Sequence, residues 1–191
     1  MASKIGIINS ALSQLGEASI TALTDVSRAA RLAERTYDDL RQDTLRDHPW
    51  NFAMKRLSIA ASTTAPVWEF AYAYPIPADC LRIVEVCNPS KLKYRVEYAN
   101  AGTIIATDIA APLKIKYTTD IEDANAMDSK FREALAARCA MNWAEPLTGT
   151  SAKVAQIAQI YTLLVKGAKA VDGQEDSPEI VTSDDWIDAR L

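Results

Sequence analysis

The side chains that could carry out chemistry are few in this chain, and their spacing does not assemble an obvious active site. His48 is the single histidine among 191 residues, so any Ser-His-Asp or Cys-His catalysis would have to use it. It stands between the end of a predicted helix and Pro49, where a histidine commonly caps the helix or interacts with its dipole. We therefore expect a structural role for His48, and no metal site built from histidines.

The acidic residues give no stronger indication of catalysis. Neighbouring carboxylates occur at positions 38–39, 122–123 and 184–185. Adjacent residues on a helix point in different directions, so Asp38 and Asp39 do not form a natural catalytic pair. The chain also lacks the GxGxxG and GxxxxGK[ST] loops that bind phosphates. We expect no enzymatic activity and no cofactor.

Composition narrows the remaining classes of function. The three cysteines, Cys80, Cys87 and Cys139, are odd in number and lack CxxC spacing, which indicates reduced thiols rather than disulfides or a zinc site. The formal net charge is −4, without the block of Lys and Arg that duplex-DNA binding normally requires. The N-terminus has no apolar signal core, and no apolar run reaches the roughly 18–20 residues of a membrane span. These features predict synthesis and folding in the cytoplasm.

Apolar residues at three- and four-residue steps predict helices at both ends of the chain. The first helix should start at an N-cap, Ser3, and end at Gly16, and the second should run from about Asp25 to Asp47. A third should be capped by Asp128 or Ser129 and end near residues 146–149. The fourth should begin near residue 151, and we expect Gly173 to begin a polar tail. The predicted buried side of this fourth helix consists of Val154, Ile157, Tyr161, Leu164, Ala168 and Val171.

The middle of the chain alternates polar and apolar residues, as half-buried strands do. The predicted strands cover residues 55–60, 69–74, 80–87, 93–98, 103–107 and 113–118, with a hairpin loop at residues 100–102. They predict one small, mostly antiparallel sheet. The expected fold class is therefore α+β, with a four-helix bundle (1–51 and 121–173), a β insertion (52–120) and an extended C-terminal tail (174–191).

Two local patterns suggest contacts between parts of the molecule or between molecules. His48, Pro49, Trp50 and Phe52 lie where the helices give way to the sheet, and we expect Trp50 and Phe52 to anchor this joint. Core packing is at least as good an explanation of these residues as a binding site.

Three arginines, Arg28, Arg31 and Arg35, share one face of the second helix. Local ion pairs with the acids at positions 34, 38 and 39 are the simpler interpretation. Contact with another subunit or with nucleic acid is the alternative.

Several segments together resemble a known family. They are residues 7–17 (IINSALSQLGE), 29–31 (AAR) with Tyr37, 45–46 (LR), 48–53 (HPWNFA), 74–82 (YPIPADCLR), 133–138 (EALAAR) and 186–190 (WIDAR). In order and spacing they are similar to the tail tubular protein A-like, packaged-DNA-stabilising head–tail adaptors of short-tailed double-stranded DNA phages. The resemblance covers nearly the whole chain.

The resemblance implies a structural protein of the virion. Such adaptors form a dodecameric ring beneath the portal, lengthen the DNA channel, help to retain packaged DNA and provide the platform for the tail nozzle. The implied partners are the portal protein, the tail nozzle protein and other copies of the chain, with DNA passing through the ring in weak contact and without a membrane. The implied location is the head–tail junction, after synthesis in the host cytoplasm.

The C-terminal tail contains apolar and charged residues suited to docking, which are Ile180, Val181, Trp186, Ile187, Arg190 and Leu191. We expect them to bind the portal or a neighbouring subunit; packing of the tail on its own helical bundle is the alternative. Two other functions stay open. A virion-associated cell-wall hydrolase would turn over peptidoglycan, and a small DNA-binding regulator would bind duplex DNA with a steep salt dependence.

Overall fold

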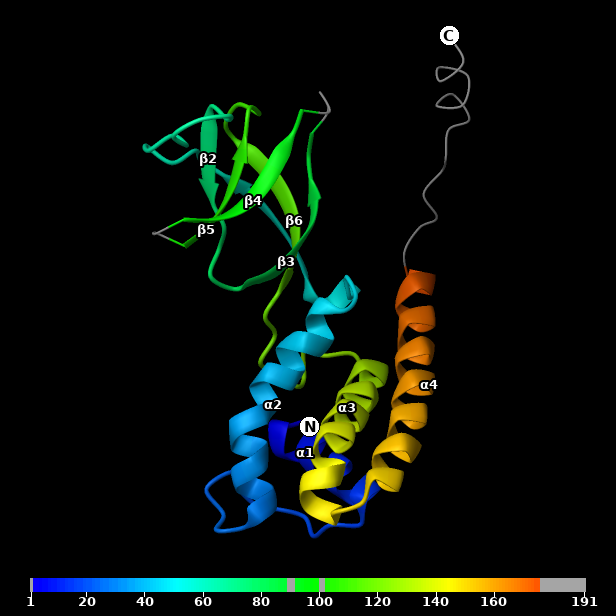
Figure 1. Cartoon of the computed structure of the whole chain (residues 1–191). Coiled ribbons are helices and arrows are strands. Elements are labelled where there is room, and N and C mark those ends of the chain that lie inside the picture. Colours follow the sequence, from blue (N-terminus) through cyan, green and yellow to red (C-terminus); the bar gives the residue numbers. More distant parts are fainter. Residues whose placement is uncertain (1, 89–91, 100–101, 176–191) are drawn as a thin grey trace.

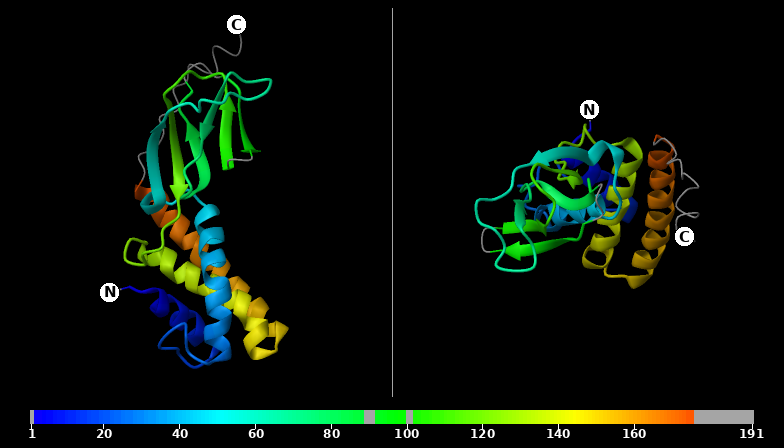
Figure 2. Two further views of the ribbon diagram at one scale, coloured as in Figure 1. Left: turned by 90° about the vertical axis from the view of Figure 1, so that its left-hand side faces the viewer. Right: turned by 90° about the horizontal axis from the view of Figure 1, so that it is seen from above.

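A computed structural model describes residues 2–88, 92–99 and 102–175, and within them the chain is α+β, with four helices and two antiparallel three-stranded sheets. The helices gather at one end of the molecule and the sheets at the other (Figure 1). The second helix points from the helical end into the sheets, which the turned view of Figure 2 also shows. The fold class agrees with the sequence. The division into separate helical and β domains stays a prediction.

The two N-terminal helices begin and end at recognisable caps. Helix α1 spans Lys4–Leu15; the Ser3 hydroxyl accepts a hydrogen bond from the Gly6 amide at 3.0 Å, and Gly16 ends the helix with a φ of 79°. Helix α2 spans Arg28–Arg46. Its predicted start at Asp25 is wrong, because Ser27 is the N-cap and the Asp25 carboxylate instead accepts hydrogen bonds from the backbone amides of residues 21 and 22.

Helix α3 begins and ends where the sequence predicted, whereas α4 is longer than predicted. Helix α3 spans Ser129–Thr148 with Asp128 as its N-cap, and it continues through Pro146 until Gly149, whose φ is 69°. A proline in the last turn costs one helical hydrogen bond without displacing the glycine cap. Helix α4 spans Ser151–Glu175, so Gly173 lies inside it and does not begin the tail.

Helix α3 lies at the centre of the helical core. Its buried residues include Phe131, Leu135 and Trp143, and they belong to one apolar cluster with Ile8 and Leu12 of α1. The Trp143 indole donates a hydrogen bond to the Thr36 hydroxyl of α2 at 2.8 Å. Helix α4 packs beside α3 at the edge of this group, as both views in Figure 2 show.

The strands form two sheets instead of the single sheet that we expected. In the first, β6 (Leu113–Thr119) lies between β1 (Met54–Ile59) and β3 (Cys80–Val86). In the second, β5 (Gly102–Thr107) lies between β2 (Tyr72–Pro75) and β4 (Tyr94–Ala99). Because β6 already has a partner on each side, the β4–β5 pair cannot extend the first sheet through it.

The two sheets share an apolar cluster of their own. Leu113, Ile115 and Tyr117 contribute from β6, and Tyr74 and Ile105 contribute from the second sheet. The Tyr74 hydroxyl donates to the Ile109 carbonyl oxygen at 2.6 Å, which satisfies its polar end. The β part therefore has a core distinct from that of the helices, and the short 3₁₀ segment Asn51–Ala53 leads from one to the other.

Candidate functional site

The joint between helices and sheets is built around Trp50. Only 1% of this residue is exposed, and it belongs to the helical cluster, where its ring lies edge-on to Phe131 with 5.1 Å between ring centroids. Its indole N–H donates to the Thr44 carbonyl oxygen of α2 at 3.1 Å. Phe52 is half-buried and packs against both the Trp50 and the Phe131 ring. The two aromatics hold the chain against the helices just before β1 begins.

His48 connects this joint to the end of α4. Its Nε2 lies 3.0 Å from Oδ2 of Asp172, and the other carboxylate oxygen of Asp172 accepts a hydrogen bond from the Asn51 amide at 2.9 Å. The Asn51 side chain donates to the Asp172 carbonyl oxygen at 2.8 Å. Asp172 is 8% exposed, and two residues, His48 and Asn51, contact its polar groups through these three interactions. The last turn of α4 is thus fixed to the segment that leaves α2.

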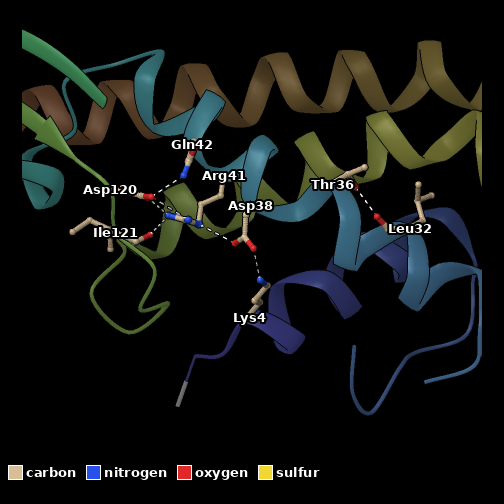
Figure 3. Close-up of polar contacts among 8 residues, drawn as sticks. All are labelled: Lys4, Leu32, Thr36, Asp38, Arg41, Gln42, Asp120 and Ile121. Carbon is tan, nitrogen blue, oxygen red and sulfur yellow. Dashed lines mark hydrogen bonds and ion pairs between the residues drawn. The ribbon is translucent and has the colours of Figure 1, made fainter. Parts of the chain in front are cut away.

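A second polar centre joins α2 to the segment between β6 and α3 (Figure 3). The Arg41 side chain is 2% exposed; its Nη1 donates to Asp120 and, at 2.7 Å, to the Ile121 carbonyl oxygen. Gln42 donates to the second Asp120 oxygen at 2.8 Å. The Arg41 Nε lies 3.5 Å from Asp38, an ionic contact too long and poorly oriented to count as a hydrogen bond.

The charges around Arg41 stabilise its ionised form. Burial by itself would lower the pKa of Arg41, but the hydrogen bond and charge of Asp120, with the charge of Asp38, raise it above its ordinary value. Burial would likewise raise the pKa of Asp38, yet Lys4, whose ammonium lies 2.8 Å away, and Arg41 lower it. Asp38 therefore links α1 to the buried guanidinium. The arrangement can hold segments together but offers no free acid or base.

Sequence reasoning missed Arg41, Asp120 and Asp172. Arg41 falls four residues after Tyr37, on the apolar stripe of α2. Because a charged residue in such a stripe needs a buried partner, its position in the sequence indicates a buried ion pair. Asp172 falls four residues after Ala168 on the buried side of α4. We had assigned this position to Val171, which is wrong, because Val171 is 39% exposed and the buried turn meets polar groups of residues 48 and 51.

The three arginines of α2 do not form the local ion pairs that we expected. Arg28, Arg31 and Arg35 are exposed, and in the described part of the chain none of them pairs with an acid. Asp38 instead turns towards Lys4 and Arg41. The tail residues Ile180, Val181, Trp186, Ile187, Arg190 and Leu191 lie outside the described residues.

Two apolar surfaces have no covering within the described residues. On one side of α4, adjoining its buried residues Ile157 and Ala168, Ile160 is 37%, Leu163 71% and Val171 39% exposed, with the exposed Gly167 between them; we call these four residues the outer face of α4. On the β part, Val67, Trp68 and Tyr98 are each at least 76% exposed and border one depression of about 580 Å³. We call these three residues the aromatic patch.

Within the described ranges, no group of three or more His, Cys, Asp or Glu side chains is placed to hold a metal ion. No helix among the same residues is both long and apolar enough to span a bilayer. The chain matches no protein-family model, and it matches no curated protein.

Proposed function

We propose that the chain is a structural head–tail adaptor of a short-tailed phage. Copies form a ring, with twelve the expected number, under the portal; the ring extends the DNA channel, helps to retain packaged DNA and carries the tail nozzle. In this proposal the four helices form the bundle that builds the ring wall, and residues 52–120 form the inserted β unit. The role is structural and not catalytic. The resemblance of the sequence segments supports it, and so do the surfaces described above.

The outer face of α4 is the observation that carries the proposal. Residues 160, 163, 167 and 171 recur at three- and four-residue steps, so they form one apolar stripe along the helix. A stripe of this kind normally faces another helix, and here its three apolar side chains are each at least 37% exposed within the described part of the chain. A glycine at position 167 lets a second backbone approach closely. A neighbouring copy of the chain is the partner that we assign to this stripe.

The aromatic patch supports the same conclusion from a different part of the molecule. It lies on the β part, remote in sequence and in element from α4. A chain with two different apolar surfaces can use one for its neighbour and the other for a second protein. Contacts between unlike surfaces close into rings when the rotation between copies permits. We assign the patch to the tail nozzle protein and the tail residues 180–191 to the portal.

The direct test is binding to the portal of the phage that encodes the chain. Purified full-length protein is mixed with assembled portal rings, and native mass spectrometry counts the bound copies. We expect a complex with as many copies as a closed ring requires, twelve on a dodecameric portal. Absence of binding at micromolar concentrations of both proteins would contradict the proposal. Peptidoglycan turnover, or duplex-DNA binding that falls steeply with salt, would favour the two alternative functions.

A further inference from the structure

The acidic character of this protein is confined to its C-terminal end. Residues 176–191 contain five acids, at positions 176, 179, 184, 185 and 188, and one base, Arg190. The whole chain has 25 acidic and 21 basic residues, so residues 1–175 contain 20 of each. The segment thus accounts for the entire net charge of −4. Its acids flank apolar residues, most clearly in the run DDWID at positions 184–188.

A groove on the β part has the complementary character. It lies between β3 and β4, has a volume of about 670 Å³, and is bordered by Ile83, Val96 and Tyr98 together with Arg46 and Arg82; we call it the β3–β4 groove. Val96 is 43% and Tyr98 87% exposed. Arg82 donates to the backbone carbonyl oxygen of Arg46 at 3.2 Å, and neither guanidinium has an acidic partner within the described residues.

The groove also runs along an unpaired strand edge. Strand β3 is hydrogen-bonded to β6 on one side, and it is the outermost strand of its sheet in the described part of the chain. The backbone amides and carbonyls of such an edge can form hydrogen bonds with an added segment in extended conformation. Ile180, Val181 and Thr182 are β-branched residues that favour this extended conformation.

The acidic segment starts close enough to reach the groove. It follows Glu175, the last residue of α4. Glu175 lies about one helical turn after Asp172, which contacts His48 and Asn51. Arg46, on the groove wall, precedes His48 by two residues. The orange end of α4 in Figure 1 lies level with the point where α2 meets the sheets. Ten residues of extended chain span up to about 33 Å, so a segment beginning at position 176 can bring Trp186 to the groove.

We propose that residues 176–191 dock within their own molecule in the β3–β4 groove. Trp186 and Ile187 contact the apolar wall formed by Ile83, Val96 and Tyr98. Asp184 and Asp185 pair with Arg46 and Arg82. Because the segment is tethered to the same molecule, its effective concentration at the groove is high, and modest contacts suffice to hold it. The docked segment is a self-contact of the free protein, and it does not depend on binding to a portal.

The test uses the full-length protein with the photoreactive residue p-benzoylphenylalanine in place of Trp186, which keeps an aromatic side chain there. After irradiation, mass spectrometry identifies the residues joined to position 186. We expect them to be groove residues of β3 and β4. In an equal mixture of ¹⁵N-labelled and unlabelled protein, the joined peptides should be uniformly labelled or uniformly unlabelled.

Charge reversal provides the second arm of the test. In this photoreactive protein, Arg46→Glu with Arg82→Glu should lower the yield at low ionic strength at least about threefold, because two ion pairs become repulsive contacts. Arg28→Glu with Arg31→Glu is the matched control, since it reverses two exposed charges on α2 away from the groove, and it should leave the yield unchanged. Circular dichroism melting checks that both variants stay folded.

Three results would overturn the inference. Mixed labelled and unlabelled peptides would mean that the segment docks on a second copy. Products outside the groove would place it elsewhere, and an unchanged yield in the Arg46/Arg82 variant would remove the role of charge. None of these results bears on whether the protein binds a portal, so the two proposals fail independently.

Discussion

At the scale of single residues, Arg41 and Asp172 show how buried charge connects segments that are distant in sequence. Arg41 contacts Asp120 and the Ile121 backbone, about 80 positions away, and Asp172 contacts His48 and Asn51, more than 120 positions away. A buried charge without such partners would pay a large desolvation penalty. The same residues are therefore also the places where removal of one partner should be most damaging.

Replacing Asp120 with alanine should destabilise the fold. Arg41 would keep the Ile121 carbonyl but lose its closest counter-charge while staying buried, and we expect a loss of about 2–4 kcal/mol in the free energy of unfolding. Urea denaturation followed by circular dichroism measures this change. Asp39→Ala is the control, because Asp39 is exposed on α2 and its loss should cost less than about 0.5 kcal/mol. Equal effects of the two substitutions would show that the Arg41–Asp120 contact is dispensable.

Trp50 and Trp68 provide a matched pair of tryptophans. Trp50→Ala would remove a ring that is 1% exposed together with its hydrogen bond to Thr44, and should cost about 3–5 kcal/mol of stability or prevent soluble expression. Trp68 is 76% exposed, and Trp68→Ala should change stability by less than about 0.5 kcal/mol. Thermal melting of both variants measures the difference. A Trp50 variant that melts within a degree or two of the unsubstituted protein contradicts its role at the joint.

At the scale of elements, α4 has two different sides. Ile157 and Ala168 on one side are each 2% exposed and contact the helical core, and Asp172 fixes the end of the helix. The adjoining side carries the outer face, on which Leu163 is 71% exposed. Helix α4 should therefore tolerate a polar substitution on that face without unfolding, while any contact with a neighbouring copy should not.

Leu163→Asp tests the proposed contact between copies. Leu163 is 71% exposed, so the variant should melt within a few degrees of the unsubstituted protein. A carboxylate in an apolar interface is costly, and ring assembly on portal should weaken at least about tenfold, as sedimentation of the complex measures. Gln159→Asp introduces the same charge on an exposed position beside the face and should assemble normally. Normal assembly of the Leu163 variant would exclude the outer face as the contact.

At the scale of the whole molecule, residues 2–175 and the acidic residues 176–191 have different roles in the proposed adaptor. The helical part and the β part each bury their apolar residues in a cluster of their own. The joint at Trp50, His48 and Asp172 connects the two parts. All of these interactions are made by residues 2–175. The stability of the protein and its recruitment to a portal should therefore be separable.

Deleting residues 176–191 should separate them. The truncated chain retains the contacts within residues 2–175 that form the two cores and the joint, so its melting temperature should stay within a few degrees of the full chain. It should lose binding to portal rings, because the deletion removes the apolar residues Ile180, Val181, Trp186, Ile187 and Leu191. Sedimentation with portal measures the second effect. A truncated protein that still assembles with unchanged affinity would show that these residues do not dock there.

Local features of the chain were predictable from sequence by itself, because they depend on neighbours in sequence. Ser3 and Gly16 bound the first helix as expected, since a cap is decided by the side chain and the φ angle at one position. The six strands appeared near their predicted positions, because alternation marks a half-buried strand wherever it lies. Once Trp50 is placed in the core, its need for a hydrogen-bond acceptor follows from the chemistry of indole.

Which strands, helix turns and side chains lie against one another was decided only by the tertiary structure. Alternation tells which face of a strand is buried but not which strand lies beside it, so the split into two sheets followed from β6 taking both β1 and β3. Helical periodicity likewise has a tolerance of one residue, and it could not distinguish Val171 from Asp172 until residues 48 and 51 were seen to lie against that turn. The Arg41–Asp120 contact joins positions 79 apart, and no local pattern specifies an interaction over that separation.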